Sequence, residues 1–383
     1  MKIKKLTFFV IIIVLSGFYV NAQKEIFVNG EGSHPCYRIP AITKAKNGDI
    51  VAFVEGRRTM HDHANNDLVI RRSSDNGNSW SRYQVIFKNE NVMVNPSPVT
   101  LKNGDILVFI EEFPNGYHAR AGGHMKLLSE GFGEGSQKLW MLRSSDHGKT
   151  WSAPLNLTKI SRGAEGKMLT SGSPAASIQL KFGKHKGRIL VPMYCTTWKG
   201  DNRYNYSSVL ISDDNGKTWR RSTNVENMLP IEGIVGVKGG SCNEFHIAQL
   251  SDEKVVINAR GNGGSRYYSI SSDGGETWTK YAEIMSGRTN NNALVALPIY
   301  SKKNILVYTQ SGDPKYRRHG ELYTSTDGVE YNKLKDLTPE ASEFGYSALT
   351  VLENGNVGLL YESFEKGNKC IRFVEIQKNE IIQ

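Results

Sequence analysis

Short hydrophobic segments alternate with turn-forming residues along most of the chain. Ile50 to Val54, Ile106 to Ile110 and Val357 to Tyr361 are examples, and each follows an Asn-Gly-Asp or Asn-Gly-Asn sequence that favours a β-hairpin turn. No long stretch repeats its hydrophobic residues with the 3.6-residue period of an amphipathic helix. The pattern therefore predicts an all-β protein built from many short strands.

An eight-residue pattern, Ser-x-Asp-x-Gly-x-Thr/Ser-Trp, recurs along the chain, and we call it the Asp box. Four copies run from Ser73 to Trp80, Ser144 to Trp151, Ser212 to Trp219 and Ser271 to Trp278, and a shortened copy contains Ser325, Asp327, Gly328 and Tyr331. In such a turn, Asp and Ser side chains bind nearby backbone N–H groups, glycine supplies a positive φ, and the buried aromatic ring anchors the turn. We therefore interpret the boxes as structural turns that do not contact a substrate.

The spacing of the boxes predicts the architecture. Their aspartates are 54 to 71 residues apart, and each interval has room for about four strands and two turns. Repeated four-stranded antiparallel units are typical of a β-propeller. Five boxes and one blade without a box predict six blades, closed by pairing a strand near Ile26 to Val28 with the last strands around Ile371 to Ile376. A β-helix or a pair of sandwiches is the alternative.

The first 22 residues are expected to form a secretory signal peptide. Three lysines precede an apolar run from Leu6 to Val20, and small residues end at Ala22. Residues 23–383 are then expected to form a single propeller domain. No later stretch approaches the roughly 18 apolar residues that a membrane span requires. We expect an exported protein that is periplasmic, attached to the cell surface or extracellular.

The net charge indicates which ligands suit the protein, and the cysteine spacing indicates which metal or redox motifs it lacks. The formal net charge is +10, of which three lysines lie in the expected leader, leaving +7. This excess suits an anionic ligand, but no basic run or aromatic-interleaved basic stripe indicates nucleic-acid binding. The four cysteines form no CxxC pair, which argues against a zinc or redox motif, and three disulfide pairings stay open. They are Cys36, Cys195, Cys242 and Cys370.

One arginine stands in an otherwise apolar strand start, in the segment Tyr37-Arg38-Ile39-Pro40. A lone arginine of this kind is more often part of a surface ion pair. With repeated Asp boxes behind it, however, the segment resembles the Arg-Ile-Pro motif that opens bacterial-type sialidase (neuraminidase) domains, and the resemblance covers nearly the whole chain after the leader. Asp boxes alone are less specific, because other secreted propellers contain them. The resemblance implies an enzyme that removes terminal sialic acids from glycans without a metal or organic cofactor.

The sialidase family implies three arginines that grip the substrate carboxylate. Arg38 matches the first, and Arg260, at the end of a predicted strand, resembles the second. Arg317 fits the third by its spacing to the last Asp box, and Arg318 beside it stays an alternative. Arg57 resembles a further substrate-facing arginine of the family. A guanidinium group suits this task because it binds a carboxylate bidentately and stays charged at any working pH.

The resemblance also implies an acid, a nucleophile and a base. Asp62, five residues beyond Arg57, matches the general acid, with Asp67 as the reserve, although an aspartate in a polar loop is usually a turn former. Tyr346 matches the nucleophile, and its Gly-Tyr-Ser setting favours exposure at a strand end, whereas the ordinary alternative is a core aromatic. Glu244, 16 residues before Arg260, matches the base that accepts the tyrosine proton, and it can also pair with that arginine.

A tyrosine nucleophile has a physical reason. The anomeric carbon of sialic acid carries a carboxylate, so an attacking carboxylate would be repelled, and sialidases are an exception to the two-carboxylate rule of glycosidases. A free tyrosine has a pKa near 10 and is a weak nucleophile unless a base accepts its proton. Tyr194 and Asn95 are further candidates for lining the substrate pocket.

The resemblance therefore implies a retaining exo-sialidase that hydrolyses α-ketosidically linked terminal sialic acids of glycoproteins, glycolipids and oligosaccharides. A trans-sialidase or an intramolecular trans-sialidase would use the same residues and is one alternative. A noncatalytic sialic-acid-binding propeller is another. That lectin would have no reason to keep the set of Asp62, Tyr346 and Glu244.

Overall fold

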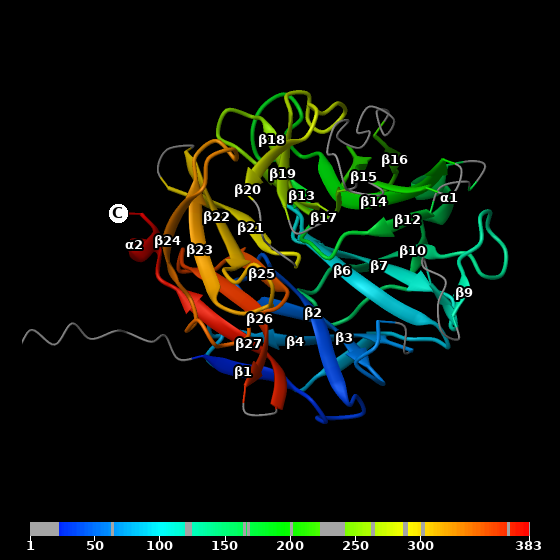
Figure 1. Ribbon diagram of the computed structural model, residues 1–383, viewed down its shortest axis with the longest axis horizontal. Helices are drawn as coiled ribbons and strands as arrows, with labels where there is room; N and C mark the ends of the chain where they lie inside the picture. Colours follow the sequence, from blue (N-terminus) through cyan, green and yellow to red (C-terminus); the bar gives the residue numbers. More distant parts are fainter. Residues whose placement is uncertain are drawn as a thin grey trace, which may run out of the picture.

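Six antiparallel sheets follow one another around a ring in the computed structural model (Figure 1). It describes residues 23–62, 65–118, 125–163, 166, 169–199, 202–222, 242–261, 265–285, 290–299, 303–365 and 368–382. The sheets are the blades of a β-propeller, which confirms the predicted fold and excludes the β-helix and the paired sandwiches. The expected leader, residues 1–22, lies outside the described residues.

The first three blades come from the first half of the chain. Blade 1 contains β2 (Cys36–Lys44), β3 (Ile50–Arg57), β4 (Asp67–Ser73) and β5 (Gln84–Phe87). Blade 2 contains β6 (Val92–Thr100), β7 (Ile106–Phe113), β10 (Lys138–Ser144) and β11 (Leu155–Asn156). Blade 3 contains β12 (Leu169–Gly172), β13 (Ile178–Gln179), β14 (Ile189–Lys199), β15 (Asn202–Ser212) and β16 (Arg220–Arg221).

The other three blades complete the circle. Blade 4 contains β17 (Cys242–Gln249), β18 (Val255–Gly261), β19 (Arg266–Ser271) and β20 (Ala282–Met285). Blade 5 contains β21 (Ala293–Pro298), β22 (Asn304–Ser311), β23 (Gly320–Ser325) and β24 (Asn332–Asp336). Blade 6 contains β25 (Ser347–Val351), β26 (Val357–Glu365), β27 (Asn368–Ile376) and β1 (Lys24–Val28).

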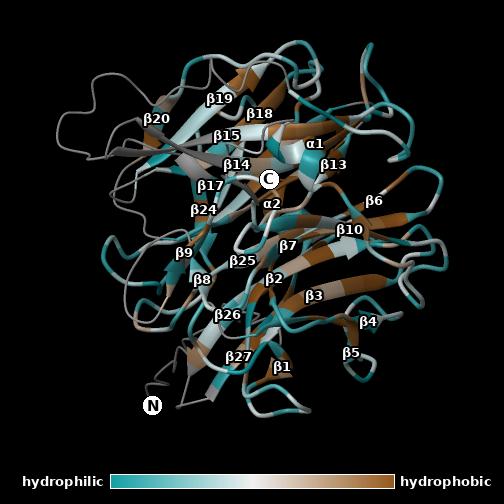
Figure 2. Ribbon diagram, turned by 90° about the vertical axis from the view of Figure 1, so that its right-hand side faces the viewer, coloured by the Kyte–Doolittle hydropathy of each residue, from teal (hydrophilic) through white to brown (hydrophobic). Residues whose placement is uncertain are grey.

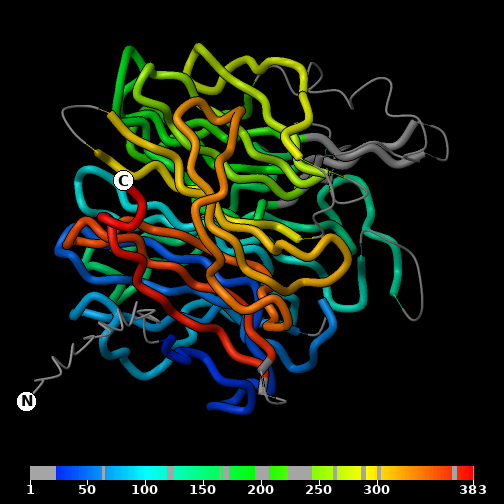
Figure 3. Tube along the Cα trace, turned by 60° about the vertical axis from the view of Figure 1, so that its left-hand side comes forward, coloured from blue at the N-terminus to red at the C-terminus, as the bar shows by residue number. Residues whose placement is uncertain are grey.

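The ring closes where the two ends of the described chain meet. Strand β1 pairs antiparallel with β27, with Val28 opposite Cys370, so blade 6 takes its outer strand from the beginning of the chain. Figure 3 shows the first and last segments running beside each other. This confirms the predicted closure. It also explains the blade without an Asp box, because in blade 6 no turn connects the third strand to the fourth.

The Asp boxes connect the last two strands of the other five blades. In the second box, Asp146 accepts hydrogen bonds from the backbone N–H of Thr150 at 2.9 Å and from the hydroxyl of Ser144 at 2.9 Å. Gly148 adopts φ 82° and donates its N–H to the Ser144 hydroxyl at 2.8 Å. These bonds confirm that the boxes are structural turns.

The hydrophobic core is divided among the joints between blades. One cluster of buried residues joins Leu190 and Val209 of blade 3 to Phe245 and Ile257 of blade 4, and similar clusters lie at the other five joints. In Figure 2, hydrophobic colour lies on strands such as β3 and β6, and hydrophilic colour lies on many of the connecting loops. Packing sheet against sheet holds the loop ends of all six blades in fixed relative positions.

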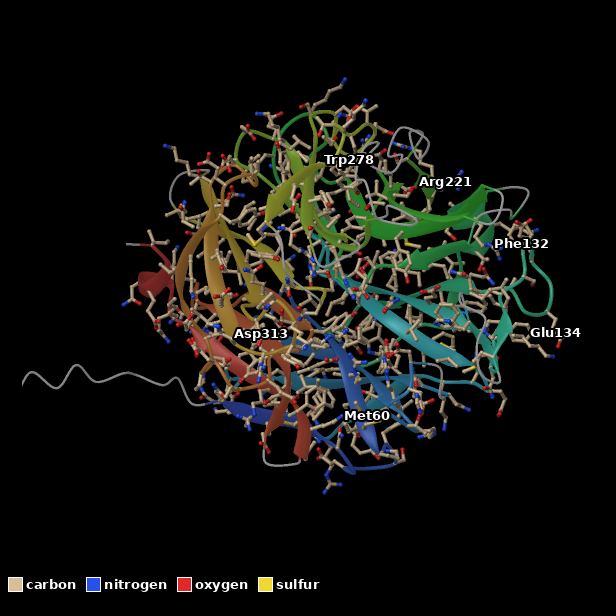
Figure 4. The ribbon with its side chains drawn as sticks, in the orientation of Figure 1. Met60, Phe132, Glu134, Arg221, Trp278 and Asp313 are labelled. Atoms are coloured by element: carbon tan, nitrogen blue, oxygen red, sulfur yellow. The ribbon has the colours of Figure 1, made fainter. Side chains whose placement is uncertain are left out.

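Few elements lie outside the blades. The connection between β7 and β10 carries the short parallel pair β8 (Tyr117–His118) and β9 (Lys126–Leu127), and Phe132 and Glu134 mark its far part at the edge of the ring in Figure 4. The described helices α1 (Thr158–Arg162) and α2 (Lys378–Ile381) each form about one turn. Among the described residues, no helix has the length and hydropathy to cross a membrane.

Candidate active site

Polar residues share one position in the repeating blade. The turn that precedes the second strand of each sheet is closed by a hydrogen bond to a backbone carbonyl, and six residues beyond that carbonyl the strand carries a polar or charged side chain in all six blades. These residues are Glu55, Glu111, Tyr194, Arg260, Thr309 and Glu362. Because the blades surround one axis, equivalent positions converge at the same end of the ring.

Tyr346 lies at the centre of a cluster of charged residues, directly before β25. Its hydroxyl donates a hydrogen bond to Glu244 Oε1 at 2.6 Å and accepts one from Arg260 Nη1 at 3.1 Å. The guanidinium groups of Arg38 and Arg317 lie 5.6 and 5.0 Å from the centre of its ring. Tyr346 lies at a strand end, as its Gly-Tyr-Ser setting predicted, but the predicted exposure was wrong. The residue is only 7 % exposed, because these neighbouring side chains enclose it.

The surroundings of Tyr346 oppose its ionisation. Burial raises the pKa of Tyr346, and the negative charge of Glu244 raises it further, while Arg260 and Arg317 act in the opposite direction. Glu244 Oε2 in turn binds Arg260 Nη1 at 2.5 Å, and this ion pair raises the pKa of the arginine. The tyrosine is therefore a neutral phenol in the resting site, with a carboxylate in position to take its proton.

Arg38 is held by Glu362, which was not among the predicted site residues. Glu362 accepts hydrogen bonds from Arg38 Nε at 3.1 Å and Nη2 at 3.2 Å, and it is only 1 % exposed. Burial alone would raise the pKa of Glu362, but Arg38 and the Ile39 N–H outweigh burial and hold it below its usual range. Glu362 occupies the same blade position as Arg260, and this repeat position is the sequence signal that could have found it.

Two buried carboxylates also support bulges in the neighbouring blade. Ile39 adopts a φ of 54° where β2 is irregular, and its N–H donates to Glu362 Oε1 at 2.9 Å. Asn95 adopts a φ of 59° at the corresponding irregularity of β6, and its N–H donates to Glu55 Oε1 at 2.9 Å. A positive φ is costly for a β-branched residue such as isoleucine, so these bonds help to hold the strained backbone beside Arg38.

Asp62 is held by two arginines at the rim of the cluster. Its Oδ1 accepts hydrogen bonds from Arg57 Nη1 at 2.9 Å and from Arg38 Nη1 at 3.3 Å, while its side chain is 65 % exposed. Arg57 is itself buried and bound by Glu55, whose Oε2 lies 2.7 Å from Arg57 Nε. Burial raises the pKa of Glu55, with the charge of Arg57 acting against this rise.

The structure separates the alternatives that the sequence left open. Arg317 lies over the Tyr346 ring, whereas Arg318 donates to Asp313 Oδ2 at 2.7 Å and lies over the Tyr316 ring at 4.4 Å. Figure 4 marks Asp313 in the connection between β22 and β23. Arg317, and not Arg318, is therefore brought to the cluster.

The remaining candidates occupy the margins of the site. Asp67 is buried and binds His34 Nε2 at 2.8 Å and Arg58 Nη2 at 3.2 Å, so the structure puts it in a separate ion pair and not beside Tyr346. Asn95 reaches Glu111 Oε2 at 3.3 Å through its Nδ2. Tyr194 is half-buried on β14, at the blade position that Arg260 and Glu362 occupy elsewhere.

A separate group of potential metal ligands lies on blade 5. It consists of His319, Glu321 and Asp336. Lys333 Nζ donates to Glu321 and to Asp336, at 2.8 Å in each case, so an ammonium group already lies between these carboxylates.

Cys36 and Cys370 are buried free thiols, and burial raises the pKa of both. The side chains of Cys195 and Cys242 lie outside the described part of the chain.

The sequence and the fold are similar to those of known proteins. A family profile described as "BNR repeat-like domain" matches residues 48–359. The chain is 28 % identical over 367 residues to a sialidase of Micromonospora viridifaciens, with 89 % of this chain and 52 % of that protein covered. It is 22 % identical over 373 residues to a sialidase of Bacteroides fragilis, with 87 % and 61 % covered. The chain thus spans only about half to three fifths of the length of these relatives.

A solved structure extends the comparison of the fold. The intramolecular trans-sialidase of Ruminococcus gnavus, determined with oseltamivir carboxylate, superposes with a TM-score of 0.73 at 15 % identity, covering 95 % of this chain and 99 % of that one. This likeness concerns the propeller fold alone. The family profile matches most of the sequence, so the chain belongs to the BNR repeat-like domain family, and the curated relatives that it resembles are sialidases.

Proposed function

We propose that this protein is an exo-sialidase that hydrolyses α-ketosidically linked terminal sialic acids of glycoproteins, glycolipids and oligosaccharides with retention of configuration. The observation that carries the proposal is the 2.6 Å hydrogen bond from the Tyr346 hydroxyl to Glu244, made beside three arginines that contact the same tyrosine. A tyrosine with a carboxylate acceptor suits attack on an anomeric carbon that already carries a negative carboxylate. The expected leader, residues 1–22, would export the enzyme to the periplasm, the cell surface or the medium.

Arg38, Arg260 and Arg317 bind the substrate carboxylate in this proposal. Their guanidinium groups all lie against Tyr346, so a carboxylate bound by them places the anomeric carbon near the tyrosine oxygen. Arg38 is fixed by its two bonds to Glu362, which limits the entropy lost when the substrate binds. Arg57 contacts the sugar from the side of Asp62, and Tyr194 and Asn95 line the pocket farther out.

The reaction then proceeds in two displacements. As Tyr346 attacks the anomeric carbon, its proton passes to Glu244, and Asp62 gives a proton to the leaving glycosidic oxygen. A covalent sialyl-tyrosine results. Water then attacks the same carbon, its proton passes to Asp62, and Glu244 returns a proton to the departing tyrosine oxygen. Sialic acid leaves with its original configuration, and both acids regain their starting protonation states.

The fate of the sialyl-tyrosine separates hydrolysis from transfer. An intramolecular trans-sialidase reaction would use a hydroxyl of the bound sialic acid in place of water, and the similarity in fold to the Ruminococcus gnavus protein motivates this second candidate. Chromatography of the products of sialyllactose, followed by mass spectrometry, distinguishes the two. Free sialic acid as the product supports the hydrolase. An anhydro-sugar, lighter than sialic acid by one water molecule, would instead indicate an intramolecular trans-sialidase.

The direct test uses a fluorogenic 4-methylumbelliferyl sialoside with the wild type and the Tyr346→Phe variant. Removing the nucleophilic oxygen should reduce kcat by at least about a hundredfold. Tyr323→Phe is a matched control, because Tyr323 is also buried and donates its hydroxyl to a glutamate, Glu321, at 2.8 Å. Full activity of Tyr346→Phe would remove this tyrosine as nucleophile. Folded wild type that binds sialosides without cleaving them would favour a sialic-acid-binding propeller.

A further inference from the structure

The backbone of residues 344–346, which ends in Tyr346, has a hydrogen bond on every N–H and C=O group. On one side the bonds go to Glu362. Its carbonyl accepts the Gly345 N–H and its N–H donates to the Tyr346 carbonyl, at 2.9 Å in each case. A Cβ atom on Gly345 would lie 2.5 Å from Glu362 Oε2, so glycine permits this close approach. The segment therefore lies directly against β26.

Two buried side chains of blade 5 bind the same segment from the other side. Asn290, in the connection that leads into β21, donates its Nδ2 to Gly345 O at 2.8 Å, and Ser311, the last residue of β22, donates its Oγ to Phe344 O at 2.6 Å. Both donors are 0 % exposed. Strands β21 and β25, the first strands of blades 5 and 6, lie beside each other (Figure 1). Without these donors two buried carbonyl groups would be unpaired, which is costly.

The backbone of Asn290 is bound in turn to blade 4. Arg266 Nη1 donates to Asn290 O at 3.3 Å, and Asn258 Oδ1 accepts bonds from Arg266 Nε at 3.0 Å and Nη2 at 2.6 Å. Arg266 lies opposite Arg260 in the pairing of β18 with β19. Because Arg260 contacts the Tyr346 hydroxyl, Asn290 connects the blade that binds this hydroxyl to the segment that carries the tyrosine backbone.

This backbone segment determines where the reactive oxygen lies. The hydroxyl is at the far end of the Tyr346 side chain, so a small tilt of the backbone at Gly345 becomes a larger shift at the oxygen. The hydroxyl has to stay within reach of Glu244, now 2.6 Å away, while it faces the bound anomeric carbon. A misplacement of about 1 Å can cost about a hundredfold in rate.

We propose that Asn290 and Ser311 are positioning residues of the sialidase reaction, whose bonds to the two carbonyl groups before Tyr346 hold its oxygen in line for attack. The inference rests on the proposed function, because it concerns how the same site holds its nucleophile. Neither residue contacts the substrate. The two residues therefore affect the rate of the covalent step, whereas the three arginines determine binding of the substrate carboxylate.

The test isolates the covalent step with a 2,3-difluoro derivative of sialic acid and the full chain. Tyr346 displaces the anomeric fluoride, its proton passes to Glu244, and mass spectrometry of the protein and its peptides detects the sialyl-tyrosine. Fluoride leaves without being protonated, so the rate does not depend on Asp62 as an acid. Labelling at several concentrations separates the rate constant of attack from the concentration that gives half of the maximal rate.

Two variants remove one donor each. In Asn290→Leu the side chain keeps nearly the same size, and because Asn290 Oδ1 accepts no hydrogen bond from the described residues, the polar change is the loss of the bond to Gly345. The labelling rate constant should fall about tenfold to a hundredfold, and the half-maximal concentration should change less than about threefold. Ser311→Ala removes a single oxygen atom and should lower the rate constant about threefold to tenfold.

Each variant has a matched control. Asn291 is 1 % exposed, donates its Nδ2 to a backbone carbonyl of blade 3 at 2.9 Å, and its Oδ1 likewise accepts no bond from the described part of the chain. Ser269 is 0 % exposed and donates to a backbone carbonyl within blade 4 at 2.7 Å. Urea unfolding should show similar losses of stability in Asn291→Leu and Asn290→Leu. The labelling rate constants of Asn291→Leu and Ser269→Ala should stay within about twofold of wild type.

An unchanged labelling rate constant in folded Asn290→Leu or folded Ser311→Ala would overturn the inference and leave Tyr346 as the proposed nucleophile. An equal fall in Asn291→Leu would also overturn it, because the effect would then follow from lost stability and not from the position of Tyr346. If Asn290→Leu does not fold, Ser311→Ala and its control decide the outcome. If the folded wild type is not labelled at Tyr346, the proposed nucleophile itself fails, and the inference with it.

Discussion

Replacing Glu362 with glutamine tests whether one buried carboxylate holds the site together. Glutamine has nearly the same shape, but it carries no charge and brings an NH2 group, a donor, where the structure supplies only donors. The Glu362 carboxylate accepts hydrogen bonds from Arg38 Nε and Nη2. It also accepts one from the Ile39 N–H at 2.9 Å and one from the Tyr346 N–H at 3.3 Å. Whichever way the amide is turned, its NH2 faces a donor and leaves Arg38 without its buried counter-ion.

The size of the effect follows from burial. Glu362 is 1 % exposed and the Arg38 side chain 11 %, so water cannot replace the lost charge easily. Removing one partner of a buried ion pair typically costs about 3–5 kcal/mol of unfolding free energy. Arg38 would also lose its fixed orientation over Tyr346, and we expect kcat/KM for a sialoside to fall about tenfold to a hundredfold, mainly through KM.

Glu112 in blade 2 provides a matched comparison. It is equally buried and accepts bonds from two asparagines, from Trp140 Nε1 and from Lys138, and the Lys138 side chain is 37 % exposed. Water can therefore solvate the lysine when the carboxylate is lost, and Glu112→Gln should cost only about 1–2 kcal/mol, with unchanged activity. Urea unfolding and steady-state kinetics of both variants give the comparison. An equal loss of unfolding free energy in the two variants would refute the proposal that Glu362 holds Arg38 in place. An unchanged KM in Glu362→Gln would refute it as well.

Two further predictions concern the choice of arginine and the response to acid. Arg317→Ala should raise KM for a sialoside by about tenfold or more. Arg318→Ala should change KM less than about threefold, because Arg318 is held by Asp313 away from Tyr346. Equal effects of the two variants on KM would contradict this assignment. Burial, reinforced by Arg266, lowers the pKa of His246 to about 3. An unfolded histidine titrates near 6.5, so between these values the unfolded state binds the extra proton, and the unfolding free energy should fall by up to about 1.4 kcal/mol per pH unit as the pH drops. Urea unfolding from about pH 7 to about pH 4 should show a shallower decline in His246→Leu, and an identical decline would exclude this histidine as the cause.

The sequence predicted the ring because its signals are local. An Asp box or an Asn-Gly turn needs only a few neighbouring residues to form, and the number of boxes then indicates the number of blades. Arg38 was recognised for a similar reason, since its Arg-Ile-Pro setting is contiguous. The closing pair of strands could also be anticipated, because a propeller must bring the two ends of its sheet series together.

Other features depend on contacts between distant segments. Glu362 stands in an ordinary hydrophobic strand, and its bonds to Arg38 exist only after blade 6 meets blade 1. The burial of Tyr346 was missed because the side chains that cover it come from other blades. The choice between Arg317 and Arg318 depends on which adjacent side chain turns inward, and the sequence pattern of this loop does not specify that direction.

The seam between the first and last blades has a consequence for the timing of activity. Arg38 and Glu362 are 324 residues apart, and Tyr346 lies on the same late blade as Glu362. During synthesis, Arg38 is made early, whereas its counter-ion Glu362 and Tyr346 are made only when nearly the whole chain is complete. In the proposed mechanism, a chain that ends before blade 6 lacks both Tyr346 and Glu362, so sialidase activity would report that the ring has closed.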